Sequence, residues 1–277
     1  MKKSNTIRFL LVIALKFYLC TGVTAHEFWI EPEKFIVKGN EKILGNLFVG
    51  QMMKGVSYGY YPRHFKRFEI KTNNSIKSLN GRIADKPAIK IPAQGNSLVT
   101  IIHATTDSEV FYNDWTTFEK FLIEKNLNLA RSRHLQNDFP KKKFKEIYSR
   151  YAKALISSGS GTGLDQKTGL EVEIVLKENP YTEDVTNGLT IEFFYKGLPR
   201  ANTQIEIFSR DINKIVTRQV ISTNSHGHAV IKVQRQTDYM INAVVMRQPD
   251  PDKTVGRNLT QPILWESLWA STSFTVP

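Results

Sequence analysis

The chain has 277 residues and a formal net charge of +12, with 38 lysines and arginines against 26 acidic residues. Its length is ample for one large domain or two ordinary ones. The single cysteine, Cys20, excludes a framework of internal disulfide bonds. No segment after residue 25 has the length and apolarity of a membrane-spanning helix.

The first 25 residues have the pattern of a secretory signal peptide. Basic residues at the start precede an apolar run over residues 9–15, and Val23-Thr24-Ala25 carries the small residues that signal peptidase requires. We therefore expect cleavage after Ala25 and a periplasmic location. Since the segment holds four basic and no acidic residues, its removal would leave 252 residues and lower the net charge from +12 to +8. A lipid-modified Cys20 and an uncleaved anchor are the alternatives.

Cleavage at this position would place His26 at the N-terminus of the exported protein. A free α-amino group has a pKa of about 7.7–8.0, so it loses its proton easily near neutral pH. The amine and the imidazole of one residue could then chelate one metal ion. The alternative is that His26 is only the residue at which the cut falls, because a metal site needs further ligands.

The first half of the exported chain alternates apolar and polar residues in short runs that predict strands. These runs are residues 28–30, 35–37, 43–49, 68–71, 89–91 and 98–103. An aromatic loop at residues 58–62 could stack on a ligand or cap one end of a sandwich. Polar turn residues separate the runs, so this half is expected to be rich in β-structure.

After Trp115 the period changes to the three- and four-residue steps of a helix. A first helix is predicted over residues 115–127. A clearer apolar face over residues 144–155 predicts a second helix. We therefore expect helices within about residues 115–156, inserted into a β-rich N-terminal domain that covers residues 26–180.

From residue 185 to residue 277, apolar runs with turns between them recur about every ten residues, which is typical of a β-sandwich. The runs are residues 189–195, 203–208, 215–221, 229–233, 240–246 and 271–276. The predicted fold class is therefore mainly β, with a sandwich-like N-terminal domain followed by a second sandwich.

Three segments resemble the DUF4198 family of exported bacterial proteins. They are residues 25–32 (AHEFWIEP), 148–155 (YSRYAKAL) and 265–274 (WESLWASTSF). Members of that family are often labelled as periplasmic components of cobalt or nickel uptake. The resemblance implies an immunoglobulin-like or transthyretin-like fold for residues 185–277, with features of carboxypeptidase-regulatory-like modules. It also implies a link to transition metals.

Six histidines are the candidate metal ligands, because the exported chain has no cysteine. His26 is the proposed anchor, and His103 is the first choice of second ligand because it ends a predicted strand in the same domain. Its alternative role is that of a hydrogen-bonded histidine at a strand end. His226 and His228 flank Gly227 in a predicted turn, and His64 and His134 lie among basic residues.

Three functions are compatible with these features. The first is a non-enzymatic periplasmic protein that binds or hands on nickel, cobalt or copper, with a metal-uptake membrane complex or another envelope protein as partner. The second is a structural or adhesion-like envelope protein without metal. The third is an oxidative copper enzyme, since polysaccharide monooxygenases also begin with a chelating histidine. No phosphate-binding loop or catalytic motif is present, and we expect no nucleic-acid partner.

Overall fold

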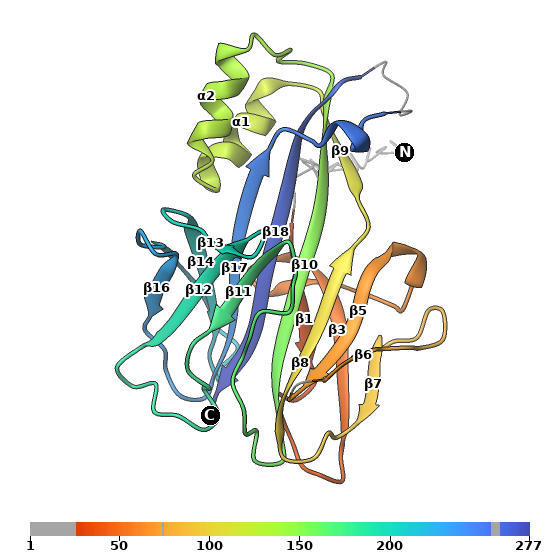
Figure 1. The fold of residues 1–277 in the computed structure, drawn as a ribbon, viewed down its shortest axis with the longest axis vertical. Coiled ribbons are helices and arrows are strands. Elements are labelled where there is room, and N and C mark those ends of the chain that lie inside the picture. Colours follow the sequence, from red (N-terminus) through yellow and green to blue (C-terminus); the bar gives the residue numbers. More distant parts are fainter. Residues whose placement is uncertain (1–25, 74, 256–260) are drawn as a thin grey trace, which may run out of the picture.

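The computed structural model describes residues 26–73, 75–255 and 261–277. The predicted signal peptide, residues 1–25, lies outside the described residues. The described chain forms a mainly β protein with three sheets and two α-helices (Figure 1). The prediction of a mainly β fold is therefore confirmed.

The largest sheet has ten strands in the order β15-β14-β17-β18-β10-β8-β5-β6, with β2 and β9 also paired to β10. At its centre the long strands β10 and β18 run parallel, with Ile147 opposite Glu266 (Figure 1). The strands are β2 Ile36–Val37, β5 Phe65–Thr72, β6 Ser75–Ser78, β8 Ser97–Thr105, β9 Ser108–Tyr112, β10 Phe144–Ser158, β14 Gln204–Arg210, β15 Val216–Ser222, β17 Thr237–Arg247 and β18 Ile263–Val276.

Two four-stranded sheets pack on the large sheet. The first contains β1 Glu27–Pro32, β3 Lys42–Gln51, β4 Lys54–Tyr58 and β7 Ile89–Pro92. The second contains β11 Val172–Leu176, β12 Leu189–Tyr195, β13 Leu198–Pro199 and β16 His228–Ile231. Short 3-10 helices, η1 Pro62–His64 and η2 Pro251–Lys253, lie in connecting segments.

Each four-stranded sheet shares its own apolar core with the large sheet. Ile30 of β1 and Ile43 of β3 pack in one core with Ile101 of β8. Ile174 of β11 and Ile191 of β12 belong to the other core. Because both faces of the large sheet are covered in this way, its central strands are buried on both sides.

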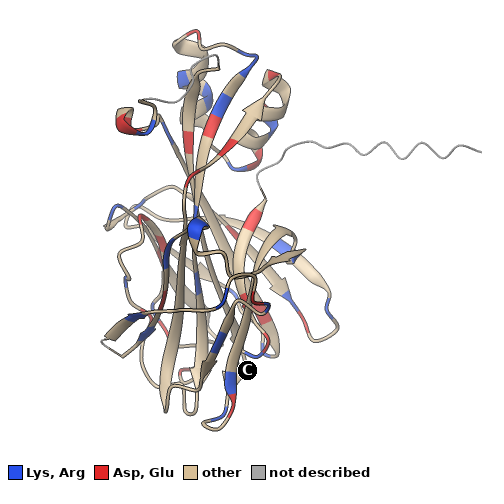
Figure 2. Ribbon diagram, turned by 90° about the vertical axis from the view of Figure 1, so that its right-hand side faces the viewer, with Lys and Arg blue, Asp and Glu red and all other residues tan. Residues whose placement is uncertain are grey.

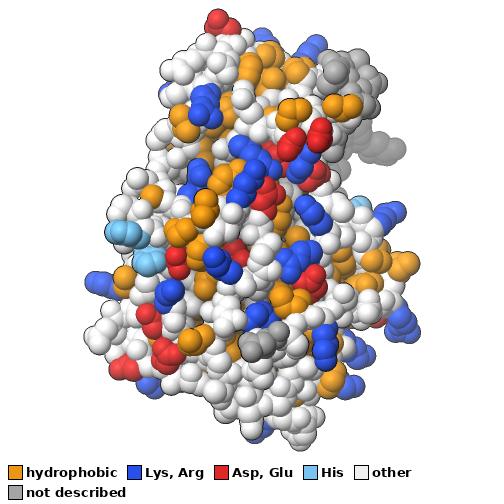
Figure 3. All heavy atoms as spheres, viewed as in Figure 1, with side chains coloured by type: hydrophobic (Ala, Val, Ile, Leu, Met, Phe, Trp, Pro, Cys, Tyr) orange, Lys and Arg blue, Asp and Glu red, His pale blue; other side chains and the backbone are white. Residues whose placement is uncertain are grey.

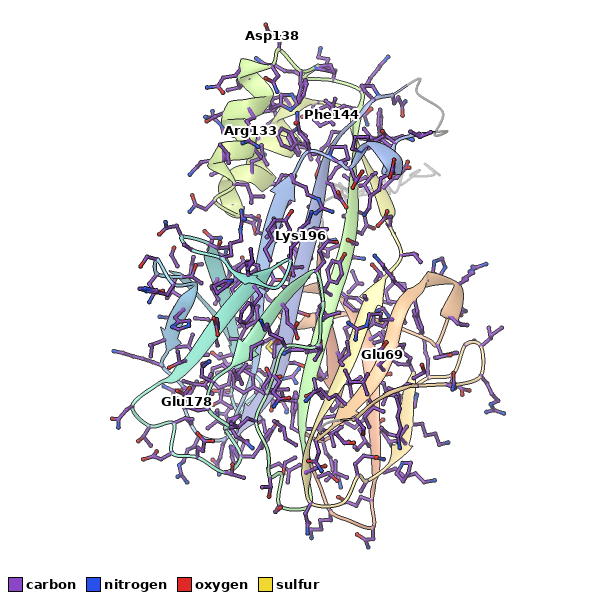
Figure 4. The ribbon with its side chains drawn as sticks, viewed as in Figure 1. Glu69, Arg133, Asp138, Phe144, Glu178 and Lys196 are labelled. Atoms are coloured by element: carbon purple, nitrogen blue, oxygen red, sulfur yellow. The ribbon has the colours of Figure 1, made fainter. Side chains whose placement is uncertain are left out.

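The helices α1, Trp115–Glu124, and α2, Asn128–Gln136, lie at one end of the long strands (Figure 1). The Asp114 carboxylate accepts a hydrogen bond from the Thr117 backbone N–H at 3.0 Å, which caps α1. Phe121 of α1 stacks on Trp269 of β18 with ring centroids 5.6 Å apart. Phe144, at the start of β10, is buried beneath these helices (Figure 4).

The predicted helix over residues 144–155 is wrong, because this segment is strand β10. Ala152, Ala154 and Ile156 point into the core under β1 and β3, whereas Tyr151 and Leu155 point into the core under β11 and β12. A strand buried on both faces has no polar side, so its sequence loses the two-residue alternation that identifies a strand. The two helices of the described chain instead lie within residues 115–136.

The large sheet combines strands from both predicted domains. β10 belongs to the segment 26–180, and its parallel partner β18 belongs to the segment 185–277. The two segments therefore share main-chain hydrogen bonds across the centre of the molecule, and the division into two domains stays a prediction.

Candidate functional site

The start of β1 presents two different faces. Phe28 and Ile30 pack in the core beneath β3 and β8, whereas Trp29 packs in a separate cluster with Phe208 and Met240. His26 immediately precedes β1, and the alternation of side chains along an extended chain would place it on the same face as Phe28.

Glu27 points to the opposite face of β1, where its Oε1 lies 3.1 Å from Nζ of Lys125. The same Nζ lies 2.8 Å from Oε2 of Glu206, and Arg218 pairs with that carboxylate at 2.6 Å. Burial is the main influence on Glu27 and raises the pKa of its carboxyl, although Lys125 acts in the opposite direction. This buried network ties the start of β1 to α1 and β14.

His103 lies in β8, so the prediction that it belongs to a strand is confirmed. Its ring is 1% exposed and is surrounded by Phe65, Phe28 and Phe68, with ring centroids 4.6, 5.1 and 5.5 Å away. Burial lowers the pKa of His103 to about 3, so the imidazole is neutral at physiological pH. A neutral imidazole is the form that binds metal ions.

Neither ring nitrogen of His103 has a hydrogen-bond partner among the described residues, and the same is true of Nδ1 of His26. The alternative role of His103, a hydrogen-bonded histidine at a strand end, is therefore not supported by its surroundings. A buried polar group without a partner costs about 1–3 kcal/mol. A ligand that accepts or donates at these nitrogens would remove that cost.

His103 lines a pocket with a cavity volume of about 240 Å³. Aromatic side chains form much of its wall, including Phe65, Tyr58, Tyr61 and Tyr148. Arg150 of β10 and the hydroxyl-bearing Thr105, Thr106 and Ser108 supply polar groups. His26 is not part of the lining, but its backbone oxygen accepts a hydrogen bond from Nη2 of Arg150 at 3.4 Å.

The pocket also contains residues that the sequence does not bring together with His103. Tyr58 and Tyr61 come from the aromatic loop, for which a ligand-stacking role was one alternative. His64, considered a poor ligand because of its basic neighbours, lines the pocket and accepts a hydrogen bond at Nε2 from Nε of Arg63 at 3.1 Å. Arg150 lies in the segment 144–155 that the sequence predicts as a helix, and the sequence gives no reason to connect it with His103.

The remaining histidines lie away from this pocket. His134 is a fully buried residue of α2, and its Nδ1 accepts a hydrogen bond from the Trp265 indole at 3.0 Å. His226 and His228 flank Gly227, whose φ of +80° confirms the predicted turn. Nε2 of His228 lies 3.4 Å from Oε1 of Glu192.

Within the described residues, no group of three or more His, Cys, Asp or Glu side chains could hold a metal ion. The two imidazoles that the sequence proposes as metal ligands come from different segments, His26 from just before β1 and His103 from β8, and His26 does not line the His103 pocket. These are the neutral nitrogen ligands that copper, nickel and cobalt accept.

On the face that Figure 3 shows, basic and acidic side chains are interspersed, and apolar side chains lie between them. The ribbon in Figure 2 likewise carries basic and acidic positions on many of its elements. Over the described part of the chain, no helix is both long and apolar enough to cross a membrane.

Comparison with known proteins identifies the family. The model of a domain of unknown function, DUF4198, matches residues 23–247, so the chain belongs to this family. No curated protein matches the chain.

Among solved structures, a tetra-tandem repeat in the extending region of a large adhesion protein matches at 10% identity with a TM-score of 0.20. The match covers 90% of this chain and 49% of that chain, so this chain spans about half the length of the matched structure. A TM-score this low carries no argument about fold or function.

Proposed function

We propose that this member of the DUF4198 family is an exported, non-enzymatic protein of the periplasm that binds a transition metal ion. The proposal includes cleavage after Ala25, His26 as the anchor and His103 as the second imidazole. Its partner would be a metal-uptake membrane complex, or another envelope protein to which the ion is handed. The proposal also includes the assignment of residues 185–277 to an immunoglobulin-like or transthyretin-like sandwich.

The observation that carries the proposal is the buried imidazole of His103, which is neutral and has no partner at either nitrogen. The alternation along the chain would place His26 on the same face of the structure, since Phe28 contacts the His103 ring and lies two residues beyond His26. A metal bound there would act as the acceptor that these nitrogens lack. Copper, nickel and cobalt are the candidates, and nitrogen ligands favour copper over nickel and nickel over cobalt.

Extension of the N-terminus by one residue should abolish tight binding. An extra glycine before His26 converts the amine into an amide, which cannot bind the ion in the same way, and we expect a loss of at least about 100-fold in Cu(II) affinity. His103→Ala should weaken binding by about 10-fold or more, whereas His226→Ala, in an exposed turn, should leave it unchanged. Binding should weaken as the pH falls, because protons compete for the same nitrogens.

Calorimetric titration of Cu(II), Ni(II) and Co(II) into these proteins measures the effect. The wild-type sample should be exported from its own signal peptide, and its N-terminal residue should be determined by mass spectrometry. Equal Cu(II) affinities with and without the extra glycine would refute the N-terminal site. A mature protein that starts elsewhere than His26 would remove the amine from the proposal.

A further inference from the structure

Arg150 is the charged group of the His103 pocket, and it differs from several half-buried arginines that meet a carboxylate. Arg210, Arg218 and Arg247 each meet a carboxylate, at 3.0, 2.6 and 2.6 Å. Arg150 forms no ion pair with a described carboxylate: Glu27 attracts it only at longer range, its side chain hydrogen-bonds to Tyr148, and its Nε has no hydrogen-bond partner. Its guanidinium nevertheless stays charged, because arginine is not deprotonated in proteins.

Two aromatic rings hold the Arg150 guanidinium in place. Its Cζ lies 4.6 Å from the centroid of the Tyr148 ring and 6.0 Å from that of the Phe28 ring. The backbone N–H of Arg150 donates to Oγ1 of Thr105 at 3.0 Å, which fixes β10 against the end of β8. The charge is thus held at the pocket on a rigid strand rather than on a mobile loop.

The described residues that line the pocket include no Asp or Glu. Its polar groups are one guanidinium, the imidazoles of His103 and His64 and a few hydroxyls, and its remaining wall is aromatic or aliphatic. The guanidinium of Arg150, without an ion-pair partner, favours an anion beside it. Arginine is suited to a carboxylate because its planar donors match the two oxygens.

We propose that this pocket binds a small organic carboxylate with an aromatic or apolar body. The carboxylate pairs with Arg150, and the body packs on Phe28, Phe65 and Tyr58. The cavity of about 240 Å³ is a little below the range of about 300–1,000 Å³ typical of ligand sites, so the ligand is small. The inference goes beyond the proposed metal function, because carboxylate binding at Arg150 requires no metal.

A comparison of benzoate, benzamide and acetate measures separately what the carboxylate and the apolar body contribute to affinity. Calorimetric titration is done in the presence of a metal chelator, so the outcome is independent of the proposed metal site. Benzoate should bind at one saturable site with a Kd of about 1 mM or tighter. Benzamide, which has the same shape without the charge, and acetate, which lacks the apolar body, should each bind at least about 10-fold more weakly.

Arg150→Met should weaken benzoate binding at least about 10-fold, since it keeps the apolar stem and removes the charge. Arg200→Met is the matched control. Arg200 also lies over an aromatic ring, with its Cζ 5.3 Å from the Tyr195 centroid and its Nε without a partner, but it is not in the lining of the pocket. This control should bind benzoate like the wild type.

Equal affinities for benzoate and benzamide, or equal benzoate affinities in wild type and Arg150→Met, would overturn the proposal. Absence of saturable benzoate binding to the wild type would do the same. Thermal unfolding monitors whether each variant is folded. If Arg150→Met does not fold, the comparison of benzoate, benzamide and acetate in the wild-type protein still decides the outcome.

Discussion

Replacement of Lys153 by methionine is expected to lower the free energy of unfolding by about 3–5 kcal/mol. The Lys153 side chain is 1% exposed, and its Nζ lies 2.9 Å from both oxygens of Asp165 and 3.2 Å from Oε1 of Glu173. The two carboxylates are 1% and 2% exposed. The substitution would remove the cation that forms ion pairs with both of them.

The directions of the pKa shifts explain why the loss is large. Burial by itself would lower the pKa of Lys153, but Asp165 and Glu173 outweigh burial and raise it. Burial raises the pKa of Asp165 even with Lys153 beside it. Without the lysine, backbone hydrogen bonds remain, such as that from the Leu176 N–H to Asp165 at 3.0 Å, but the nearest remaining cation, Lys71, acts on the two carboxylates only at longer range. Such a site either takes up protons or admits water, and both cost stability.

Urea unfolding of Lys153→Met at neutral pH measures the loss. Lys177→Met is the matched control, since Lys177 is 48% exposed and meets Glu192 at 3.5 Å. We expect a change of less than about 1 kcal/mol there, because water screens an exposed pair. Addition of Asp165→Asn and Glu173→Gln to Lys153→Met should restore part of the stability. A loss at Lys153 no larger than at Lys177 would contradict the role of the buried triad.

The strands that the sequence predicts well are those with different surroundings on their two faces. Leu189–Tyr195 is predicted and observed as β12, in which buried and partly exposed residues alternate at its start. Its period of two is visible in the sequence because only one face lies in the core. β10 has no such contrast, since eight consecutive residues at its end are buried. The apolar spacing that it does have fits a helix by coincidence.

The sequence alone predicts only part of the candidate site. His103 could be selected because the one cysteine, Cys20, lies in the predicted signal peptide, and because His103 ends a predicted strand in the same domain as His26. Arg150 could not, since its role depends on pairing between β10 and strands far away in the sequence, which places it beside Tyr148, Phe28 and Thr105. A local pattern gives no information on which arginine will lack a carboxylate after folding. That information requires the long-range arrangement of the sheets.

The second large expected effect is a loss of stability as the pH rises, caused by Glu146. This residue of β10 is fully buried. Its carboxylate accepts hydrogen bonds from the hydroxyl of Tyr112 at 2.8 Å and from that of Ser267. The Trp269 indole N–H donates in turn to Oγ of Ser267 at 2.9 Å. Among the described residues, the side chains that interact with the Glu146 carboxyl are the hydroxyls of Ser267 and Tyr112, and no basic side chain is among them.

Burial raises the pKa of Glu146 to about 7 from an ordinary value of 4.5, and the hydrogen bonds from Ser267 and Tyr112 only partly oppose this shift. Between these two pH values the unfolded chain has released the proton, whereas the folded protein keeps it. The folded state therefore binds more protons in this window, and its stability falls as the pH rises from about 4.5 to about 7. The contribution is fully present below pH 4.5 and is lost above pH 7.

The size of the effect follows from the shift, since one pKa unit corresponds to about 1.4 kcal/mol and the whole window to about 3 kcal/mol. Glu146→Gln mimics the protonated side chain and does not titrate. The variant should therefore gain about 3 kcal/mol relative to the wild type between pH 4.5 and pH 7.5. Urea unfolding at several pH values in this range measures the difference in unfolding free energy between the variant and the wild type. Titratable groups that the two proteins share contribute equally to both and cancel in this difference.

Glu183→Gln provides the control, because Glu183 is an exposed carboxylate in a loop and its loss should not change how stability varies with pH. If the curves for wild type and Glu146→Gln run parallel from pH 4.5 to pH 7.5, then Glu146 does not keep its proton in the folded state. In that case water or a rearranged hydroxyl must solvate the charge between β10 and β18. The hydrogen bonds from Tyr112 and Ser267 would then stabilise the ionised form of Glu146, since a carboxylate has no proton of its own and can accept both of them.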